Sequence, residues 1–241
     1  MRIYGVHPVE ELLKTAPGSV SALYYTSREV DQFQEALELA GTHGIQCQAI
    51  DHQKLDKMSE GGNHQGILAQ TVGFEYVTAD DLIDATSEAS QAGILVLDQV
   101  QDPRNLGAMI RSAAGMGFDG VVIPKDRAAP VTPTVVRTSA GCAFRIPIAR
   151  VTNISRTLEL LKDGGYWIVG SRMAEAEPAW EIDFDMKAGL VLGGEHKGMR
   201  RLVAETCDLY AKIPLAAGID SLNVASAATA LMYEVRRQQS G

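Results

Sequence analysis

The sequence predicts an α/β protein in which a small N-terminal α/β domain precedes a larger C-terminal domain built on a mainly parallel sheet. Short apolar runs alternate with helical patterns along most of the chain, which is typical of parallel α/β architecture. The run Gly93-Ile-Leu-Val-Leu97 is apolar throughout, as expected of a strand buried on both faces of such a sheet. The chain has 241 residues, 46% of them hydrophobic, which is enough for one large or two small cores.

The N-terminal domain is expected over residues 1–72, as a small sandwich of helices and strands. Its strands are predicted at 20–25, 45–50 and 66–72, and its helices at 8–14 and 29–40. Residues 73–91 contain five acidic residues and no basic residue. We interpret them as an acidic linker with one short helix.

The C-terminal domain is expected over residues 92–241. Its strands are predicted at 93–97, 120–123, 145–148, 166–169, 189–192 and 210–213. One helix is predicted at 105–115, with Asn105 as its N-cap. Another is predicted at 221–237, with Ser221 as its N-cap. On the first of these helices Arg111 points away from the apolar stripe that would pack on the sheet.

The charge of the chain is unevenly distributed. Its 22 basic and 30 acidic residues give a net charge of −8, which by itself disfavours a nucleic-acid partner. Residues 104–156, however, contain eight basic and two acidic residues. This local excess indicates either a solvated face or an anion-binding surface.

Several classes of protein are disfavoured by what the sequence lacks. The three cysteines (Cys47, Cys142 and Cys207) are odd in number and widely spaced, which argues against a disulfide framework and favours a reducing cytoplasm. The N-terminus has no secretory signal, and no apolar run approaches the ~20 residues of a membrane helix. The five histidines show no metal-ligand spacing, and neither HExxH nor GxSxG occurs. We therefore expect no metal, no membrane and no serine-hydrolase chemistry.

Three stretches are candidates for chemistry. They are Asn105-Leu-Gly-Ala-Met-Ile-Arg111, the loop Gly193-Gly-Glu-His-Lys-Gly198, and the segment 213–226, which contains Ile213-Pro-Leu and Ser221-Leu-Asn223. Ligands in open α/β sheets bind beyond the carboxyl ends of strands, and glycines let a backbone approach a ligand closely. Each stretch also has a purely structural explanation, namely a solvated arginine, a tight turn and a helix cap.

In this order, the three stretches resemble the three motifs of the SpoU (TrmH-like) branch of the SPOUT RNA methyltransferases, with Ala225 standing where the family usually has serine. The likeness covers nearly the whole chain. Tyr4-Gly-Val-His7 and Asn63-His-Gln-Gly-Ile67 resemble the L30e-like substrate-binding domain of one subgroup. That subgroup methylates the ribose 2′-OH of a guanosine in the peptidyl-transferase region of 23S ribosomal RNA.

The resemblance implies a C-terminal trefoil knot, S-adenosylmethionine as cofactor, and a homodimer with shared active sites that acts on 23S rRNA or a ribosomal assembly intermediate. The residues it implies for cofactor binding are Gly193, Gly198, Ile213 and Leu222. Those implied for the reaction site are Asn105, Arg111, Glu195, Ser221 and Asn223. Because a guanidinium stays protonated, our hypothesis is that Arg111 anchors a phosphate and stabilises the developing alkoxide rather than acting as a base.

Three alternatives remain at this point. The same chemistry on tRNA differs only in substrate, and a non-catalytic RNA-binding protein would have a degenerate cofactor site. A dinucleotide-dependent dehydrogenase would need GxGxxG between a strand and a helix. Here that pattern, Gly115-Met-Gly117-Phe-Asp-Gly120, follows a helix and precedes a strand. Its glycines are expected to end the helix instead.

Overall fold

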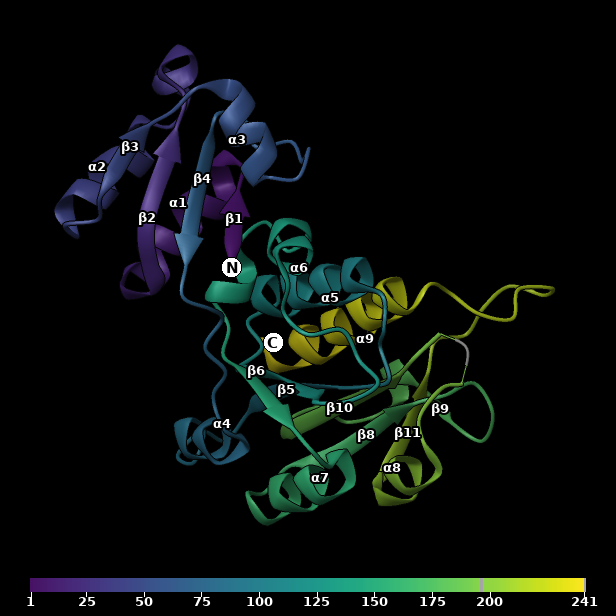
Figure 1. Ribbon diagram of the computed structural model, residues 1–241. Helices are drawn as coiled ribbons and strands as arrows, with labels where there is room; N and C mark the ends of the chain where they lie inside the picture. The colour runs from purple at the N-terminus through teal and green to yellow at the C-terminus, as the bar shows by residue number, and fades with distance from the viewer. Residues whose placement is uncertain (196, 241) are drawn as a thin grey trace. The chain divides into compact units, whose positions relative to one another are not determined.

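The computed structural model describes residues 1–195 and 197–240, and its elements group into two compact units (Figure 1). The first unit consists of Met1–Glu75 together with Val131–Arg145. The second unit consists of Tyr76–Pro130 and Ile146–Gly241. Both units combine helices with a β-sheet, so the predicted α/β class is confirmed.

The first unit contains a mixed four-stranded sheet in the order β1-β4-β2-β3. Its strands are β1 (Arg2–Tyr4), β2 (Val20–Tyr25), β3 (Cys47–Ala49) and β4 (Ile67–Thr71). Strand β4 pairs antiparallel with both β1 and β2, whereas β2 and β3 are parallel. The interior strand β4 is buried at every position except the half-buried Gln70, whereas the edge strand β3 is exposed throughout.

Helices and short 3₁₀ turns complete the first unit. They are α1 (Val6–Thr15), η1 (Pro17–Ser19), η2 (Ser27–Gln32), α2 (Gln34–Thr42), α3 (His52–Met58), α6 (Pro133–Thr138) and η3 (Cys142–Phe144). The single helix expected at 29–40 is wrong, because the chain breaks at Phe33. There the backbone leaves the helical region (φ −137°, ψ 31°) so that the Phe33 ring is fully buried.

The second unit is built on a seven-stranded sheet in the order β7-β6-β5-β10-β8-β11-β9, with every pairing parallel. Its strands are β5 (Ala92–Asp98), β6 (Gly120–Pro124), β7 (Ile148–Val151), β8 (Trp167–Ser171), β9 (Glu177–Pro178), β10 (Lys187–Gly193) and β11 (Leu209–Lys212). The central strand β5 is buried at every position, as its apolar sequence predicts.

Helices cover both faces of this sheet (Figure 1). They are α4 (Ala79–Ala85), α5 (Pro103–Gly115), α7 (Ile154–Asp163), α8 (Arg201–Thr206) and α9 (Val224–Gln239), with the turn η4 (Ala179–Glu181). One face forms a core in which Ile94, Val96 and Val191 pack with apolar residues of α7 and α8. On the other side α5 and α9 pack against each other, and Ser112 Oγ lies 2.7 Å from Thr229 Oγ1.

Two predicted helix starts are wrong by a few residues. Helix α5 begins at Pro103 with Asp102 as its N-cap, because the Asp102 carboxylate accepts the Arg104 N–H at 2.7 Å. Proline is favoured in the first turn because its missing N–H has no partner there. Helix α9 begins at Val224, and its N-cap is Asn223 rather than Ser221. The true caps leave Asn105 and Ser221 available for other contacts.

Two further details concern strand boundaries. The strand expected at 145–148 starts later, at Ile148, because Pro147 has no N–H to donate to a ladder. The GxGxxG pattern ends helix α5 as predicted, since Gly117 has a left-handed backbone (φ 69°) before β6 begins at Gly120.

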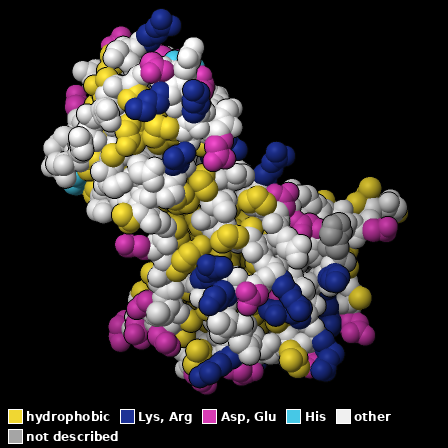
Figure 2. Space-filling view, viewed as in Figure 1, with side chains coloured by type: hydrophobic (Ala, Val, Ile, Leu, Met, Phe, Trp, Pro, Cys, Tyr) yellow, Lys and Arg dark blue, Asp and Glu magenta, His cyan; other side chains and the backbone are white. Residues whose placement is uncertain are grey.

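The acidic stretch forms the short helix α4, as predicted, and acidic side chains gather over it in the view of Figure 2. Thr78 and Asp81 form a capping box at its start. Among the residues that the structure describes, none of the three cysteines forms a disulfide. In the part of the chain that the structure describes, no helix is long and apolar enough to cross a membrane.

Candidate active site

The candidate site lies where two neighbouring parallel strands end. Strands β5 and β10 pair in register up to Asp98 and Gly193. We define residues 193–200, which begin at the end of β10, as the catalytic loop. This loop and the turn that follows β5 therefore leave the sheet side by side. This edge is where open α/β sheets bind their ligands.

Three of the predicted reaction-site residues form one hydrogen-bonded chain. Asn105 Nδ2 donates to Glu195 Oε1, and Asn223 Nδ2 donates to Asn105 Oδ1 at 3.1 Å. Because a carboxylate only accepts, Glu195 fixes which way the Asn105 amide faces, and Asn105 then fixes Asn223. These residues are 90 and 118 positions apart in the sequence, so the contacts depend entirely on the tertiary fold.

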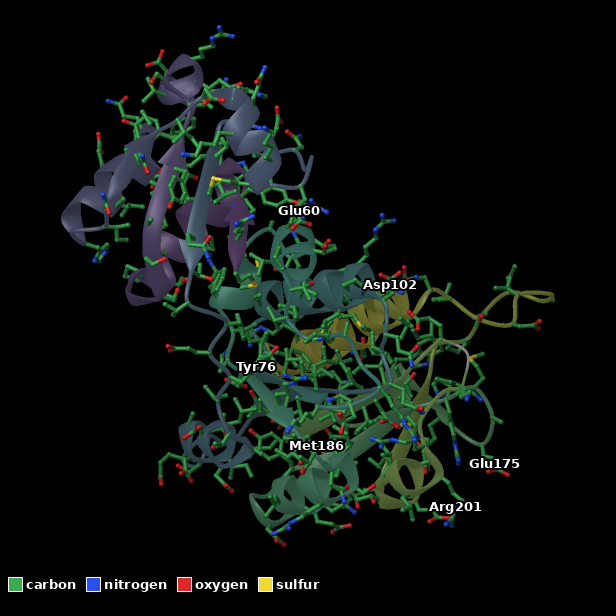
Figure 3. All side chains as sticks on the ribbon, in the orientation of Figure 1. Glu60, Tyr76, Asp102, Glu175, Met186 and Arg201 are labelled. Atoms are coloured by element: carbon green, nitrogen blue, oxygen red, sulfur yellow. The ribbon has the colours of Figure 1, made fainter. Side chains whose placement is uncertain are left out.

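Local structure holds each member of this chain in place. Asp102, labelled in Figure 3, caps α5 and so fixes the helical turn that carries Asn105. Asn223 Oδ1 accepts the N–H groups of Ala225 at 2.9 Å and Ser226 at 3.3 Å. The Asn223 side chain thus both caps α9 and reaches Asn105.

The catalytic loop is folded tightly on its own backbone. A Cβ at Gly193 would overlap the backbone of Gly198 and Met199, and one at Gly194 would overlap the Gln99 carbonyl. Gly194 and Gly198 form an isolated antiparallel bridge, and Gly198 adopts φ 62°. The glycines are therefore required by close backbone approach.

A buried ion pair anchors the end of this loop. Asp98 at the end of β5 is fully buried, and its Oδ2 accepts the Arg200 backbone N–H at 2.8 Å. Its Oδ1 accepts from Arg200 Nε at 2.8 Å and Nη2 at 2.7 Å. Three charge-assisted bonds therefore tie the loop to the central strand.

The first cavity of the site contains every residue predicted to bind the cofactor. It is lined by Gly193, Gly198, Ile213 and Leu222, and also by Glu195 and Ser221. Gly193, Gly194 and Gly198 contribute backbone without side chains, and Leu192, Leu215 and Val224 add apolar surface. This combination fits S-adenosylmethionine, which presents a flat base, a ribose and a charged sulfonium.

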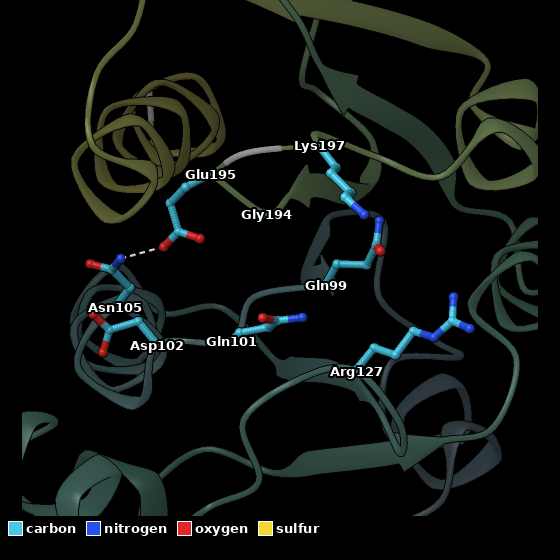
Figure 4. Close-up of a pocket in the computed structure, with 8 residues that line it drawn as sticks. All are labelled: Gln99, Gln101, Asp102, Asn105, Arg127, Gly194, Glu195 and Lys197. Atoms are coloured by element: carbon cyan, nitrogen blue, oxygen red, sulfur yellow. Dashed lines mark hydrogen bonds between the residues drawn. The ribbon is translucent and has the colours of Figure 1, made fainter.

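A second cavity of about 740 Å³ lies on the other side of the same loop (Figure 4). We call it the polar cavity because every lining residue except Gly194 has a polar or charged side chain; these residues are Gln99, Gln101, Asp102, Asn105, Arg127, Gly194, Glu195 and Lys197. Gly194 and Glu195 line both cavities. The two binding spaces therefore share one wall, at the carboxylate of Glu195.

Arg111 is not brought to this site within one chain. It is exposed on α5 and lines neither cavity. It lies six residues beyond Asn105, about 9 Å along the helix and about 240° around it. Asn105, Glu195, Ser221 and Asn223 thus converge, and Arg111 does not.

The basic residues of 104–156 are divided between the two units. Arg137 and Arg145 belong to the first unit, where they pair with the Tyr4 hydroxyl and with Glu11. Arg127 and Arg150 belong to the second unit. The sequence excess is therefore not a single continuous surface of one unit.

One group of possible metal ligands exists away from this site. His52, Asp56 and His64 place their ligand atoms within 4.8 Å of one another. However, the Gly66 N–H donates to His64 Nδ1 at 3.0 Å, and His64 Nε2 contacts Asp56 at 3.1 Å. A neutral histidine that binds a metal through Nε2 carries its proton on Nδ1. In His64 this form is excluded, because Nδ1 accepts the Gly66 N–H and therefore has no proton. The geometry is that of a hydrogen-bonded trio.

This fold and paired cavity are those of an RNA methyltransferase. The model of the SpoU rRNA Methylase family matches residues 92–233, and the model of RNA 2′-O ribose methyltransferase substrate binding matches residues 2–77. The chain belongs to the SpoU rRNA methylase family. It is an S-adenosylmethionine-dependent RNA 2′-O-methyltransferase, as the three sequence motifs predict.

Individual relatives agree with this assignment. The chain is 45% identical over 210 residues to the Bacillus subtilis protein YacO, named as a TrmH family tRNA/rRNA methyltransferase, covering 87% of this chain and 84% of that one. It is 37% identical to the Vibrio cholerae 23S rRNA (guanosine-2′-O-)-methyltransferase RlmB, covering 98% and 96%. Its fold is similar to that of an AdoMet-bound rRNA methyltransferase from Sinorhizobium meliloti, with a TM-score of 0.83, 26% identity and coverage of 98% and 86%.

Sequence reasoning missed the anchor and most of the polar cavity. Asp98 ends an apolar strand, and an acid at that place is a signal that could have been followed. Gln99 and Gln101 carry no motif. Their role depends on backbone angles and on loops distant in sequence.

Proposed function

We propose that this enzyme methylates the ribose 2′-OH of a guanosine in the peptidyl-transferase region of 23S rRNA. The observation that carries the proposal is the hydrogen-bonded chain of Glu195, Asn105 and Asn223 at the wall between a cofactor cavity and a polar cavity. The choice of 23S rRNA is supported by the likeness to RlmB over 98% of the chain and by the substrate-binding match at residues 2–77.

S-adenosylmethionine, held by Gly193, Gly198, Ile213 and Leu222, supplies an activated methyl group. The side chains of the chain orient the acceptor ribose, and such positioning supplies much of the rate of a displacement reaction. Glu195 accepts from Asn105, so one of its oxygens is held fixed at the wall between the cavities. We assign Glu195 and the two asparagines a positioning role toward the 2′-hydroxyl.

Arg111 completes the site in a homodimer. Since it faces away from both cavities of its own chain, we infer that α5 of a second copy presents it to the site. There its guanidinium would hold the phosphate next to the reacting ribose and stabilise the developing alkoxide. The trefoil knot implied by the family resemblance is consistent with segments 193–198 and 213–222 meeting at one cavity. A cytoplasmic location follows from the same assignment.

The test is transfer of labelled methyl groups from S-adenosylmethionine to unmodified 23S rRNA, 16S rRNA and tRNA in parallel. We expect label in 23S ribose, and its loss in Arg111→Ala with cofactor affinity unchanged. Mixed dimers of Arg111→Ala and Glu195→Ala chains should recover up to one working site. Label in tRNA alone would overturn the 23S assignment, and full activity of Arg111→Ala would overturn the role of that residue.

A further inference from the structure

The proposed function places the reacting ribose beside Glu195 but gives no role to the other side chains of the polar cavity. Its volume of about 740 Å³ lies in the range of small-molecule sites in proteins. Because Gly194 and Glu195 line both cavities, a group bound in the polar cavity lies directly beside the cofactor cavity. The residues implied for the cofactor line the first cavity, which leaves the polar cavity to the RNA that receives the methyl group.

The side chains of this cavity match a nucleotide. Gln99 and Gln101 present carboxamides, and Arg127 and Lys197 present positive charge (Figure 4). Neither carboxamide makes a hydrogen bond to another of the residues that the structure describes, so each is available to a ligand. Amides both donate and accept, as the edges of bases require, and cations pair with phosphates.

The backbone at two of these residues is strained. Gln99 has φ 64° and Arg127 has φ 59°, in the left-handed region that non-glycine residues rarely adopt. Strain of this kind clusters at active sites and ligand-binding sites. At Gln99 it is locked by the neighbouring loop, because the Gln99 carbonyl packs where Gly194 has no side chain. The turn after β5 is thus held in the shape that lines the cavity.

We propose that this cavity binds the unstacked base and an adjoining phosphate of the target nucleotide, with the Gln101 carboxamide pairing with the base edge and Arg127 with the phosphate. This inference rests on the proposed function. A base must leave its stack before an enzyme can surround its nucleotide, and hydrogen bonds to the base in a pocket recover part of that cost. Gln101 is exposed at the start of α5, two positions before Pro103, so its side chain is free to turn toward the ligand.

The first test compares Gln101→Ala with the wild type in single-turnover methyl transfer to a 23S rRNA fragment. We expect kcat/KM to fall roughly 10- to 100-fold, the range for losing one bidentate base contact. The comparison is then repeated with a fragment whose target nucleotide lacks its base. There the two enzymes should be equally slow, because the contact is absent in both. A loss of equal size on both fragments would overturn the base contact.

The second test measures how RNA affinity depends on salt for Arg127→Ala. Removing one phosphate contact should lower the slope of log affinity against log salt by about one. Arg201→Ala is the matched control, since Arg201 is an exposed arginine of the same unit, paired with Glu205, that lines neither cavity. An unchanged slope in Arg127→Ala would overturn the phosphate contact.

The affinity for S-adenosylmethionine should be unchanged in both variants. Failure of the wild type to methylate any RNA would refute the proposed function, and with it the inference. A wild type that methylates RNA, with variants that match it in every assay, would refute the inference alone.

Discussion

Two loops of this protein are held by carboxylates in very different ways. In the second unit, the catalytic loop 193–200 is tied to Asp98, which is 0% exposed and bound three times by Arg200. In the first unit, the loop 59–66 is tied to Asp56, whose side chain is 48% exposed and contacts His52 and His64. The glycines of the two loops differ as well. Gly193 packs on backbone, whereas Gly62 faces the ring of Tyr4.

The loop 193–200 therefore has an anchor that solvent does not reach, whereas the anchor of the loop 59–66 is in contact with solvent. A buried aspartate paired with arginine keeps its charge partner at all ordinary pH values, because a guanidinium does not titrate there. An exposed aspartate paired with histidines depends on solvent and on pH. The catalytic loop, which forms a wall of both cavities, has the rigid kind of anchor.

The largest effect is expected for Gly193→Ala. The new methyl group would overlap the backbone of Gly198 and Met199, which cannot move without opening the loop. We expect the Kd for S-adenosylmethionine to rise by about 100-fold or more, as expected when several contacts are lost together. Isothermal titration calorimetry measures it directly.

Gly62→Ala is the matched variant in the first unit. The three atoms nearest to its methyl group all belong to the far end of the Tyr4 side chain, which can move if it gives up its hydrogen bond with Arg137. It should cost about 1–2 kcal/mol of unfolding free energy, the usual result of overpacking, and leave cofactor affinity unchanged. Wild-type cofactor affinity in Gly193→Ala would show that the loop is not held by its backbone.

A smaller effect is expected for Asp98→Ala. Removal of the buried carboxylate leaves Arg200 without its partner, and the free energy of unfolding should fall by about 3 kcal/mol. Because the catalytic loop loses its anchor, the Kd for the cofactor should rise by about 10-fold. Urea denaturation and calorimetry provide the two measurements. Asp56→Ala is the control: its exposed side chain predicts a smaller loss of stability and no change in cofactor affinity.

The smallest effect is a pH dependence confined to the first unit. Hydrogen bonds from His52 and then from His64 hold the pKa of the Asp56 carboxyl below its ordinary value of 3.8. A lowered folded-state pKa gives stability that is complete above that ordinary value and is lost as the pH falls through the lower one. Urea unfolding of Asp56→Asn and the wild type between pH 7 and pH 3 should therefore give a difference that shrinks toward pH 3. A difference that is constant with pH would contradict this account of the trio.

The sequence alone predicted the class of fold, the positions of most strands along the chain, and most of the residues that the structure brings together at the candidate site, although Arg111 is not among them. Apolar runs located the buried strands because burial on both faces of a parallel sheet demands them. The boundaries failed where a single local interaction decides them. Asp102 is the N-cap of α5 instead of Asn105 because it directly precedes Pro103, which begins the helix. The helix expected at 29–40 is interrupted at Phe33, whose side chain is buried in the core.

What only the tertiary structure decided is how residues far apart in sequence meet. The Glu195–Asn105–Asn223 chain, the Asp98–Arg200 anchor and the polar cavity each join separate loops at the carboxyl edge of the parallel sheet. Sequence patterns report which residues are apolar or flexible, since those properties are local. Hydrogen bonds and cavities depend on the register of strands β5 and β10, which the packing of the whole second unit fixes.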